Sequence, residues 1–333
     1  MVNKLLLRLF EGELLNKDEA DGLLRHLLQG GEPPAKLVAL MSIFRLRPIT
    51  VAELDGFRSA VLNLSVPIDL GEGELVDICG TGGDGKDTFN ISTLAAIVTA
   101  AAGVRVVKHG NYGFSSSCGS SNVLEAAGVR FSSDVGLLKR CLDEAGICFL
   151  HAPLFHPALK SAAALRKEFG IRSFFNLLGP LVNPARPKVQ VTGVSNPELQ
   201  RLYGYVLDRS GQRYSIVYAL DGYDEVSLTG KAKLVGSSGE VVLGPGDFGL
   251  QPVKPEEITV VGGAAGALRA FNSILAGQGT QAEMSVVLAN SAVALKTFAP
   301  ERELLECVGL ARETLLSGKA LAALDRVVEV MGG

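Results

Sequence analysis

The hydrophobic positions divide the chain into two regions that differ in period. Between Asn16 and Leu64, leucines and other apolar residues recur at intervals of three and four, as on one face of an α-helix. Breaks at residues 30–34 and at Arg47-Pro48 separate this region into several helices. Residues 1–15 carry charged side chains among leucines, so they predict a further amphipathic helix and not a signal peptide.

After Pro67, short apolar runs of β type alternate with glycine-rich turns and alanine-rich helical stretches. This alternation is typical of a mostly parallel sheet with helices on its faces. Residues 236–249 predict a hairpin or an excursion, because turn residues bracket the short run at 240–243. We expect strands at residues 75–79, 104–107, 147–150, 189–194 and 215–220.

Composition narrows the class of protein. A chain of 333 residues with 47% hydrophobic residues is long and apolar enough for two domains with a full core. The net charge of −3 gives no overall positive field, so a small-molecule partner is favoured over nucleic acid or anionic lipid. No apolar stretch has transmembrane length, and the five cysteines show no CxxC spacing, so we expect a cytoplasmic protein with reduced thiols.

Two glycine- or serine-rich loops follow predicted strands. Residues 80–85, Gly-Thr-Gly-Gly-Asp-Gly, lie between a strand and a helix that runs to Ala102. Such a loop lets backbone N–H groups approach a phosphate, although a flexible connection would look the same. The next strand ends in Lys108-His109-Gly110-Asn111, and residues 115–121 form a hydroxyl-rich loop that could solvate an anion or simply turn the chain.

Acidic and cationic side chains follow the later strands. Asp224 and Glu225 come after the strand at 215–220, where both carboxylates can reach one region and suit Mg²⁺, although a solvated turn has the same spacing. His156 and Arg166 lie on or before a helix that we expect from Pro157 to Phe169. Open α/β sheets bind ligands at the carboxyl ends of their strands. The glycine loop, Lys108, the hydroxyl-rich loop and the carboxylate pair at that edge therefore predict a magnesium-diphosphate site.

Six ordered motifs then resemble a known family, that of the anthranilate phosphoribosyltransferases. The motifs extend over nearly the whole chain, and they are Asp77-x-x-Gly80-Thr81-Gly82-Gly83-Asp84-Gly85, Thr88-Phe89-Asn90-Ile91-Ser92-Thr93, Lys108-His109-Gly110-Asn111, Phe175-Asn176-Leu177-Leu178-Gly179-Pro180-Leu181-x-Asn183-Pro184, Gly222-x-Asp224-Glu225-x-Ser227 and Asp247-Phe248-Gly249-Leu250.

The resemblance implies a fold, an assembly and a reaction. It implies a small all-helical domain at residues 1–67, with a contribution from about 168–186, hinged to an α/β phosphoribosyl-diphosphate-binding domain at 68–333. It also implies a homodimer joined through the helical domains. The reaction is attack of the anthranilate amine on C1 of phosphoribosyl diphosphate, with release of pyrophosphate, in tryptophan biosynthesis.

The resemblance also assigns residues to each ligand, with no covalent nucleophile and with Lys108 in an electrostatic role. For phosphoribosyl diphosphate it implies Gly80, Gly83, Asp84, Thr88, Asn90, Ile91, Ser92, Thr93, Lys108 and Ser120. For anthranilate it implies Gly80, His109, Asn111, His156 and Arg166. For Mg²⁺ it implies Ser92, Asp224 and Glu225.

The chain departs from the family pattern at three positions. Tyr112 stands where the family commonly has arginine, Ser117 where it commonly has lysine, and Asn122 where aspartate is frequent. The loop therefore carries fewer cations. Two other functions remain as alternatives: a pyrimidine nucleoside phosphorylase, whose Lys-His-Ser signature is missing here, and a silent relative that binds nucleic acid, which the net charge and the acidic pair oppose.

Overall fold

The structure, a computed structural model, describes residues 1–113 and 118–332, and it divides the chain into two compact units. The first unit comprises residues 1–68 and 152–186, and the second comprises residues 69–151 and 187–333, of which residues 114–117 and 333 are not described. The second piece of the first unit begins at Ala152, upstream of the segment near 168–186 that the family resemblance implies.

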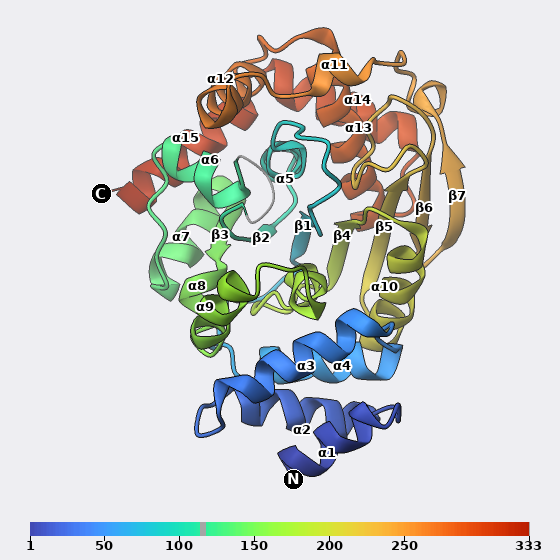
Figure 1. The fold of residues 1–333 in the computed structure, drawn as a ribbon. Helices are drawn as coiled ribbons and strands as arrows, with labels where there is room; N and C mark the ends of the chain where they lie inside the picture. The colour runs from blue at the N-terminus through green and yellow to red at the C-terminus, as the bar shows by residue number, and fades with distance from the viewer. Residues whose placement is uncertain (114–117, 333) are drawn as a thin grey trace. The chain divides into compact units, whose positions relative to one another are not determined.

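The first unit is helical, as the apolar periodicity predicts. Helices α2 and α4 pack side by side, and α1 and α3 pack against them (Figure 1). Its elements are α1 (Val2–Phe10), α2 (Lys17–Leu28), α3 (Pro34–Leu46), α4 (Val51–Asn63), α8 (Ala152–Phe155), α9 (Leu159–Phe169) and the 3₁₀ turns η1 (Phe174–Leu177) and η2 (Gly179–Leu181). The helix expected from Pro157 thus begins at Leu159, within the usual uncertainty of helix ends.

Local sequence signals explain where these helices begin and end. Asn16 caps α2, because its side chain accepts a hydrogen bond from the Glu19 N–H while the Glu19 carboxylate accepts one from the Asn16 N–H. Pro34 occupies the first turn of α3, where a missing N–H costs nothing. Gly170 ends α9 in the left-handed conformation, with φ of +64°, which glycine adopts readily.

An aromatic cluster joins the two pieces of the helical unit. Phe44 of α3 and Phe57 of α4 meet edge to face with ring centroids 5.2 Å apart. Phe174 of η1 lies 4.6 Å from Phe57 and stacks on Phe175 at 4.4 Å. Such pairs stabilise beyond the area they bury, so Phe174 joins the start of the motif at residues 175–184 to the N-terminal helices.

A buried carboxylate organises the turn between α3 and α4. Glu53 is fully buried and accepts hydrogen bonds from the N–H groups of Leu15 and Thr50, from the Thr50 hydroxyl and from both terminal nitrogens of Arg47. Burial alone would raise the pKa of Glu53, but these donors, Arg47 first, hold it below its ordinary value. Glu53 is therefore charged and fully paired.

The second unit contains one seven-stranded sheet in the order β3-β2-β1-β4-β5-β6-β7. Strands β1 to β5 are parallel, and β6 and β7 add an antiparallel hairpin at one edge, as expected for residues 236–249. The strands are β1 (Val76–Gly80), β2 (Val106–Gly110), β3 (Ile147–His151), β4 (Val189–Gly193), β5 (Arg213–Ala219), β6 (Ala232–Gly236) and β7 (Gly239–Leu243). All five predicted strands are confirmed, with their ends shifted by a few residues.

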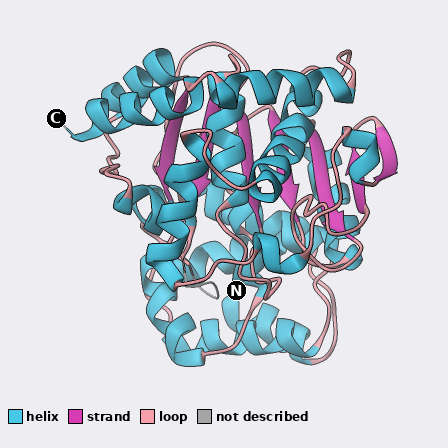
Figure 2. Cartoon of the chain, turned by 90° about the horizontal axis from the view of Figure 1, so that it is seen from above, coloured by secondary structure: helices cyan, strands magenta, loops and turns pink. Residues whose placement is uncertain are grey.

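Helices lie on both sides of the strands (Figure 2). The helices α5 and α13 pack on each other and on the central strands, and α15 packs on α5 and α7. The elements are α5 (Ile91–Ala101), α6 (Ser120–Ala126), α7 (Val135–Ala145), α10 (Pro197–Ser210), η3 (Pro245–Phe248), α11 (Pro255–Ile258), α12 (Gly263–Leu275), α13 (Gln281–Phe298), α14 (Leu304–Leu316) and α15 (Lys319–Gly332). The fold class predicted from the sequence, a helical unit with a mostly parallel α/β unit, is confirmed.

Over the residues that the structure describes, a search for a helix with the length and apolarity needed to cross a membrane finds none. All five cysteines are free; four are buried, and Cys118 is only half-buried.

The pairing of Glu53 yields a stability prediction. We expect Glu53→Ala to lower the free energy of unfolding by about 3 kcal/mol or more, because it leaves the buried groups of Arg47, Leu15 and Thr50 without their acceptor. Urea unfolding followed by circular dichroism measures the change. The control is Glu240→Ala, which removes an exposed pair with Lys233 and should shift the midpoint little. Equal shifts for both variants would contradict the assignment.

Candidate active site

The sheet order brings the predicted motifs to one place. Strand β1 lies between β2 and β4, so the connections leave it in opposite directions on its two sides. In open α/β sheets ligands bind at this topological switch point, outside the carboxyl ends of the strands. The glycine loop follows β1, the Lys-His-Gly-Asn motif ends β2, and the acidic pair follows β5.

Asp224 fixes the glycine loop. Its Oδ2 accepts a hydrogen bond of 2.8 Å from the Gly82 N–H, and the Thr81 N–H donates to the Gly193 carbonyl at 2.9 Å. Gly82, Gly83 and Gly85 have positive φ values of +63°, +77° and +74°, which other residues adopt only with strain. The loop is therefore held in one conformation by a residue of a distant segment.

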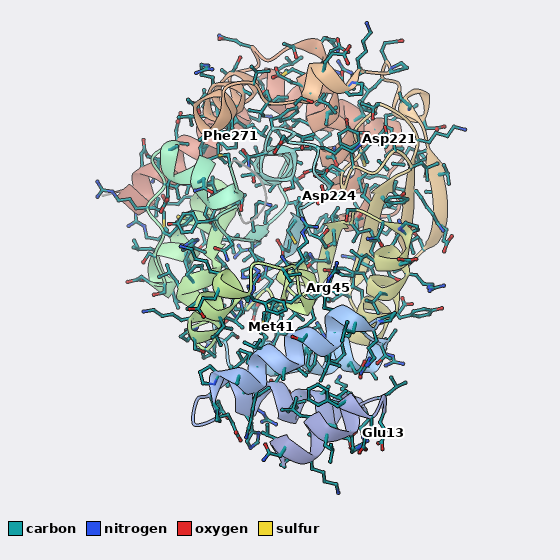
Figure 3. The ribbon with its side chains drawn as sticks, in the orientation of Figure 1. Glu13, Met41, Arg45, Asp221, Asp224 and Phe271 are labelled. Carbon is teal, nitrogen blue, oxygen red and sulfur yellow. The ribbon has the colours of Figure 1, made fainter. Side chains whose placement is uncertain are left out.

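Two strand-end glycines leave room for this contact. A Cβ on Gly80 would lie 2.6 Å from the Asp224 Oδ2, and a Cβ on Gly193 would lie 1.5 Å from the Asp224 carbonyl oxygen. Neither glycine has a positive φ. Both glycines allow another segment to come close. Residues 221–229 reach the ends of β1 and β4 because the last residue of each strand has no side chain. Figure 3 shows Asp224 within the α/β unit, whereas Asp221 is exposed.

Negative charge accumulates around Asp224. Burial raises the pKa of Asp224 to about 7, and the nearby Asp84 carboxylate adds to the effect, while the bond from Gly82 opposes it. Removal from water raises the pKa of Glu225 well above its ordinary value, and Asp224 and Asp84 raise it further. The Ser92 backbone N–H and Lys108 act in the other direction. A cation at this place would relieve the repulsion among these carboxylates.

Lys108 ties β2 to β1 and to the start of α5. It is 2% exposed, and its Nζ donates to the Ile78 carbonyl at 2.5 Å and to the Ser92 hydroxyl at 3.4 Å. Burial lowers the pKa of Lys108, and the charges of Asp77 and Glu225 counteract this. The His109 N–H donates to the buried Asp77 carboxylate at 3.2 Å. Asp77, the first residue of the glycine motif, thus joins the two strand ends.

The motif at residues 88–93 contributes in two different ways. The Asn90 side chain donates to the Cys118 carbonyl at 3.0 Å, and its Oδ1 is buried with no hydrogen-bond partner among the described residues. Ile91 and Thr93 are buried in the first turn of α5, so a ligand could reach Ile91 only through its main chain. Thr88 forms an isolated bridge with Thr259.

Asn111 and Ser120 lie together, since the Ser120 hydroxyl donates to the Asn111 carbonyl at 3.3 Å. Of the departures from the family pattern, Tyr112 and Asn122 are described, and Ser117 lies outside the described residues, as do Ser115 and Ser116.

The remaining two predicted residues belong to the helical unit. His156 is 3% exposed at the end of α8, and burial lowers its pKa to about 4. The Arg166 guanidinium of α9 lies over the Phe175 ring, 5.3 Å from its centroid. The contact with Phe175 orients the Arg166 side chain within the helical unit.

Sequence reasoning missed two residues near the acidic pair. Lys86, the residue directly after the glycine loop, places its Nζ 4.6 Å from the ring centroid of Tyr223, which precedes Asp224 in sequence. Gly193 lies inside the strand predicted at residues 189–194, and its contact with Asp224 depends on strand order, which the sequence does not give. The sequence signal for Lys86 is its place directly after the glycine motif.

The contact at Gly193 can be tested by adding one methyl group. Gly193→Ala should weaken binding of a magnesium-diphosphate ligand at least tenfold, because the Asp224 main chain must move away from β4. Isothermal titration calorimetry measures the affinity. Gly309→Ala is the matched control, since a Cβ there meets nothing within 4 Å. Unchanged affinity in Gly193→Ala would contradict the proposed constraint.

Buried His156 predicts a pH dependence of stability. The unfolded chain has the ordinary histidine pKa of 6.5, whereas the folded value is about 4, so the unfolded state binds more protons between them. Stability from this group is therefore complete above pH 6.5 and is lost as pH falls toward 4, by on the order of 3 kcal/mol.

Urea unfolding between pH 7 and 4.5 should show a shallower loss in His156→Gln than in the parent protein. The exposed His26→Gln serves as the control and should retain the parent slope. Equal slopes in His156→Gln and the parent would contradict the prediction.

Comparison with known proteins gives a consistent result over both units. The glycosyl transferase family model for an a/b domain matches residues 72–321, and that for a helical bundle domain matches residues 3–65. An anthranilate phosphoribosyltransferase of Flavobacterium psychrophilum is 46% identical over 99% of both chains. One of Bacteroides fragilis is 44% identical over 99% of this chain and all of its own.

Solved structures agree in fold. Anthranilate phosphoribosyltransferase from Thermus thermophilus superposes with a TM-score of 0.92 at 35% identity, covering 98% of this chain and 99% of its own. The enzyme from Saccharomyces cerevisiae, in complex with PRPP and Mg, gives a TM-score of 0.92 at 26% identity, covering 99% of this chain and 98% of its own.

Proposed function

The chain belongs to the anthranilate phosphoribosyltransferase family, and on this basis we propose that it transfers the phosphoribosyl group of phosphoribosyl diphosphate (PRPP) to the amine of anthranilate. The products are N-(5-phosphoribosyl)anthranilate and pyrophosphate, in tryptophan biosynthesis. The single observation that supports this function best is the glycine loop held by Asp224 at the switch point, with Lys108 and Ser92 beside it.

The donor set suits Mg²⁺. Asp224 and Glu225 supply hard carboxylate oxygens, Ser92 supplies a hydroxyl, and their charges repel one another without a cation. The described residues contain no group of three or more His, Cys, Asp or Glu side chains arranged to hold a metal. The partial set fits Mg²⁺, which keeps several waters and binds substrate phosphates. When bound, Mg²⁺ would neutralise charge on the leaving pyrophosphate.

The substrate residues that we propose are those implied by the motifs. PRPP is bound by Gly80, Gly83, Asp84, Thr88, Asn90, Ile91, Ser92, Thr93, Lys108 and Ser120. For anthranilate we propose Gly80, His109, Asn111, His156 and Arg166. The solved yeast complex with PRPP and Mg supports these two ligands, and a yeast complex with 4-fluoroanthranilate supports the class of the second substrate.

The chemistry needs neither a nucleophilic side chain nor a strong base. An aromatic amine is unprotonated near neutral pH, so its nitrogen attacks C1 of the ribose directly and loses its proton after the bond has formed. The difficult event is departure of pyrophosphate, as positive charge develops on the ribose. In the proposed mechanism, Lys108 and the loop N–H groups stabilise the negative leaving group, and Asn111 and Arg166 orient the acceptor.

The proposal extends to the oligomeric state, the cellular location and the partners of the protein. We propose a cytoplasmic homodimer joined through the helical unit, where Leu7, Phe10 and Leu14 expose large apolar side chains. The proposed domains are a helical domain at residues 1–67, with a contribution from about 168–186, and a PRPP-binding domain at residues 68–333. The partners are the two small substrates, with no nucleic acid and no membrane.

The direct test is a fluorescence assay of anthranilate consumption with PRPP and Mg²⁺. We expect turnover in the parent protein and a loss of at least about a hundredfold in the double variant Asp224→Asn, Glu225→Gln, because the leaving group loses its electrostatic support. The control is Asp221→Asn, an exposed residue three positions earlier, whose rate should stay within about twofold.

Near-normal rates of the double variant at saturating Mg²⁺ would contradict the metal assignment. Consumption of thymidine with phosphate, and none of anthranilate with PRPP, would instead identify a nucleoside phosphorylase.

A further inference from the structure

One side chain holds together two points on the path between β2 and α6. The Oδ1 of Asn122 accepts a hydrogen bond of 3.0 Å from the Gly113 N–H and a second of 3.0 Å from the Gly119 N–H. Gly113 follows the Lys-His-Gly-Asn motif, and Gly119 immediately precedes α6. Asn122, in the first turn of α6, thus bridges the departing and the returning chain.

The two glycines touch at this point. A Cβ on Gly119 would lie 2.1 Å from the Gly113 nitrogen, nearer than any real Cβ contact. Gly119 has no positive φ, so the requirement for glycine here is space and not backbone conformation. The close approach and the shared acceptor describe one clamp, consisting of Asn122, Gly113 and Gly119.

Proposed binding residues for both substrates are attached to this clamp. The Asn111 carbonyl accepts from the Ser121 N–H at 3.2 Å and from the Ser120 hydroxyl at 3.3 Å. On the other side, the Asn90 side chain donates to the Cys118 carbonyl at 3.0 Å. Asn111 is assigned to anthranilate, and Ser120 and Asn90 are assigned to PRPP, so the clamp fixes groups of both sets.

The helix that carries Asn122 is itself anchored on β3. The Ser121 hydroxyl and the His151 Nδ1 are 2.9 Å apart, and the His151 ring stacks on Phe131 with centroids 4.6 Å apart. Tyr112 packs edge-on against His151 at 4.8 Å and donates its hydroxyl to Glu125. The position of Asn122 is therefore fixed by the contacts of α6 with β3. Its hydrogen bonds position Gly113 and Gly119, and those glycines do not position Asn122.

We propose that Asn122 is a positioning residue for phosphoribosyl transfer, which sets the position of Asn111 relative to Ser120 and Asn90 by holding Gly113 against Gly119. The inference rests on the proposed function. Asn122 touches no substrate in this role; it acts through the residues that do. Its amide accepts both hydrogen bonds without adding negative charge beside a site for a diphosphate.

Substitutions at Asn122 can separate the clamp from the helix cap. Asn122→Ala removes both hydrogen bonds. Asn122→Gln retains a side chain that can cap the Gly119 N–H, as glutamine commonly does three residues into a helix, but the added methylene moves its oxygen away from Gly113. Asn122→Asp retains a short acceptor in the same place.

Steady-state kinetics of the full-length protein with PRPP, anthranilate and Mg²⁺ test the inference. We expect Asn122→Ala and Asn122→Gln to raise the KM for both substrates by about tenfold or more, with Asn122→Asp nearer to the parent. A purely structural role would lower the folded fraction and hence the apparent kcat, but it would leave KM unchanged. Thermal melting reports the folded fraction, and Asn122→Gln should melt like the parent.

The matched control is Asn63→Ala, the same substitution at an exposed position at the end of α4, which leaves the clamp and its anchor intact. It should keep both KM values within about twofold. Parent-like KM values for Asn122→Ala and Asn122→Gln would overturn the inference while the proposed function stands. A parent protein that does not consume anthranilate with PRPP would overturn both.

Discussion

The hydrogen bond from the Gly82 N–H to the Asp224 carboxylate is the contact on which the candidate site depends. It joins the glycine loop after β1 to the segment after β5, and it forms because Gly80 and Gly193 leave the strand ends bare. Asp224 is therefore both a structural acceptor and a proposed metal ligand. One of its oxygens accepts the hydrogen bond that fixes the loop proposed to bind the diphosphate. The same carboxylate is proposed to bind the Mg²⁺ that accompanies the diphosphate.

The buried charges around this contact all lie near other charged groups. Lys108 is buried yet lies near Asp77 and Glu225, and the acidic pair lies near Asp84. Removing water makes each charge costly alone, so each depends on a neighbour of opposite sign or on a bound ion. In the helical unit, the buried charge of Glu53 needs no ligand, because hydrogen-bond donors of the protein pair with both of its carboxylate oxygens.

Much of this could be predicted from the sequence, because the strongest signals are local. The period of the apolar residues located the helices, and the alternation of strand and glycine turn located the five parallel strands. The motifs at residues 80–85 and 108–111 could be recognised because glycine, lysine and asparagine follow apolar runs there. The roles of Gly193 and Asn122 were not accessible in this way. The contact of Gly193 with Asp224 depends on strand order, and the two hydrogen bonds of Asn122 depend on the path of the chain between Gly113 and Gly119.

The length of chain between Gly82 and its acceptor also bears on how the protein is made. The two residues are 142 positions apart, and the pieces of the helical unit are interrupted by residues 69–151. During synthesis the glycine loop leaves the ribosome long before Asp224 exists, so it has no partner to order it until most of the chain has been translated. The helical unit likewise stays incomplete until residue 186 has emerged. Such long-range pairing slows folding, and it means that an early truncation product would contain the phosphate motif in sequence but not the site.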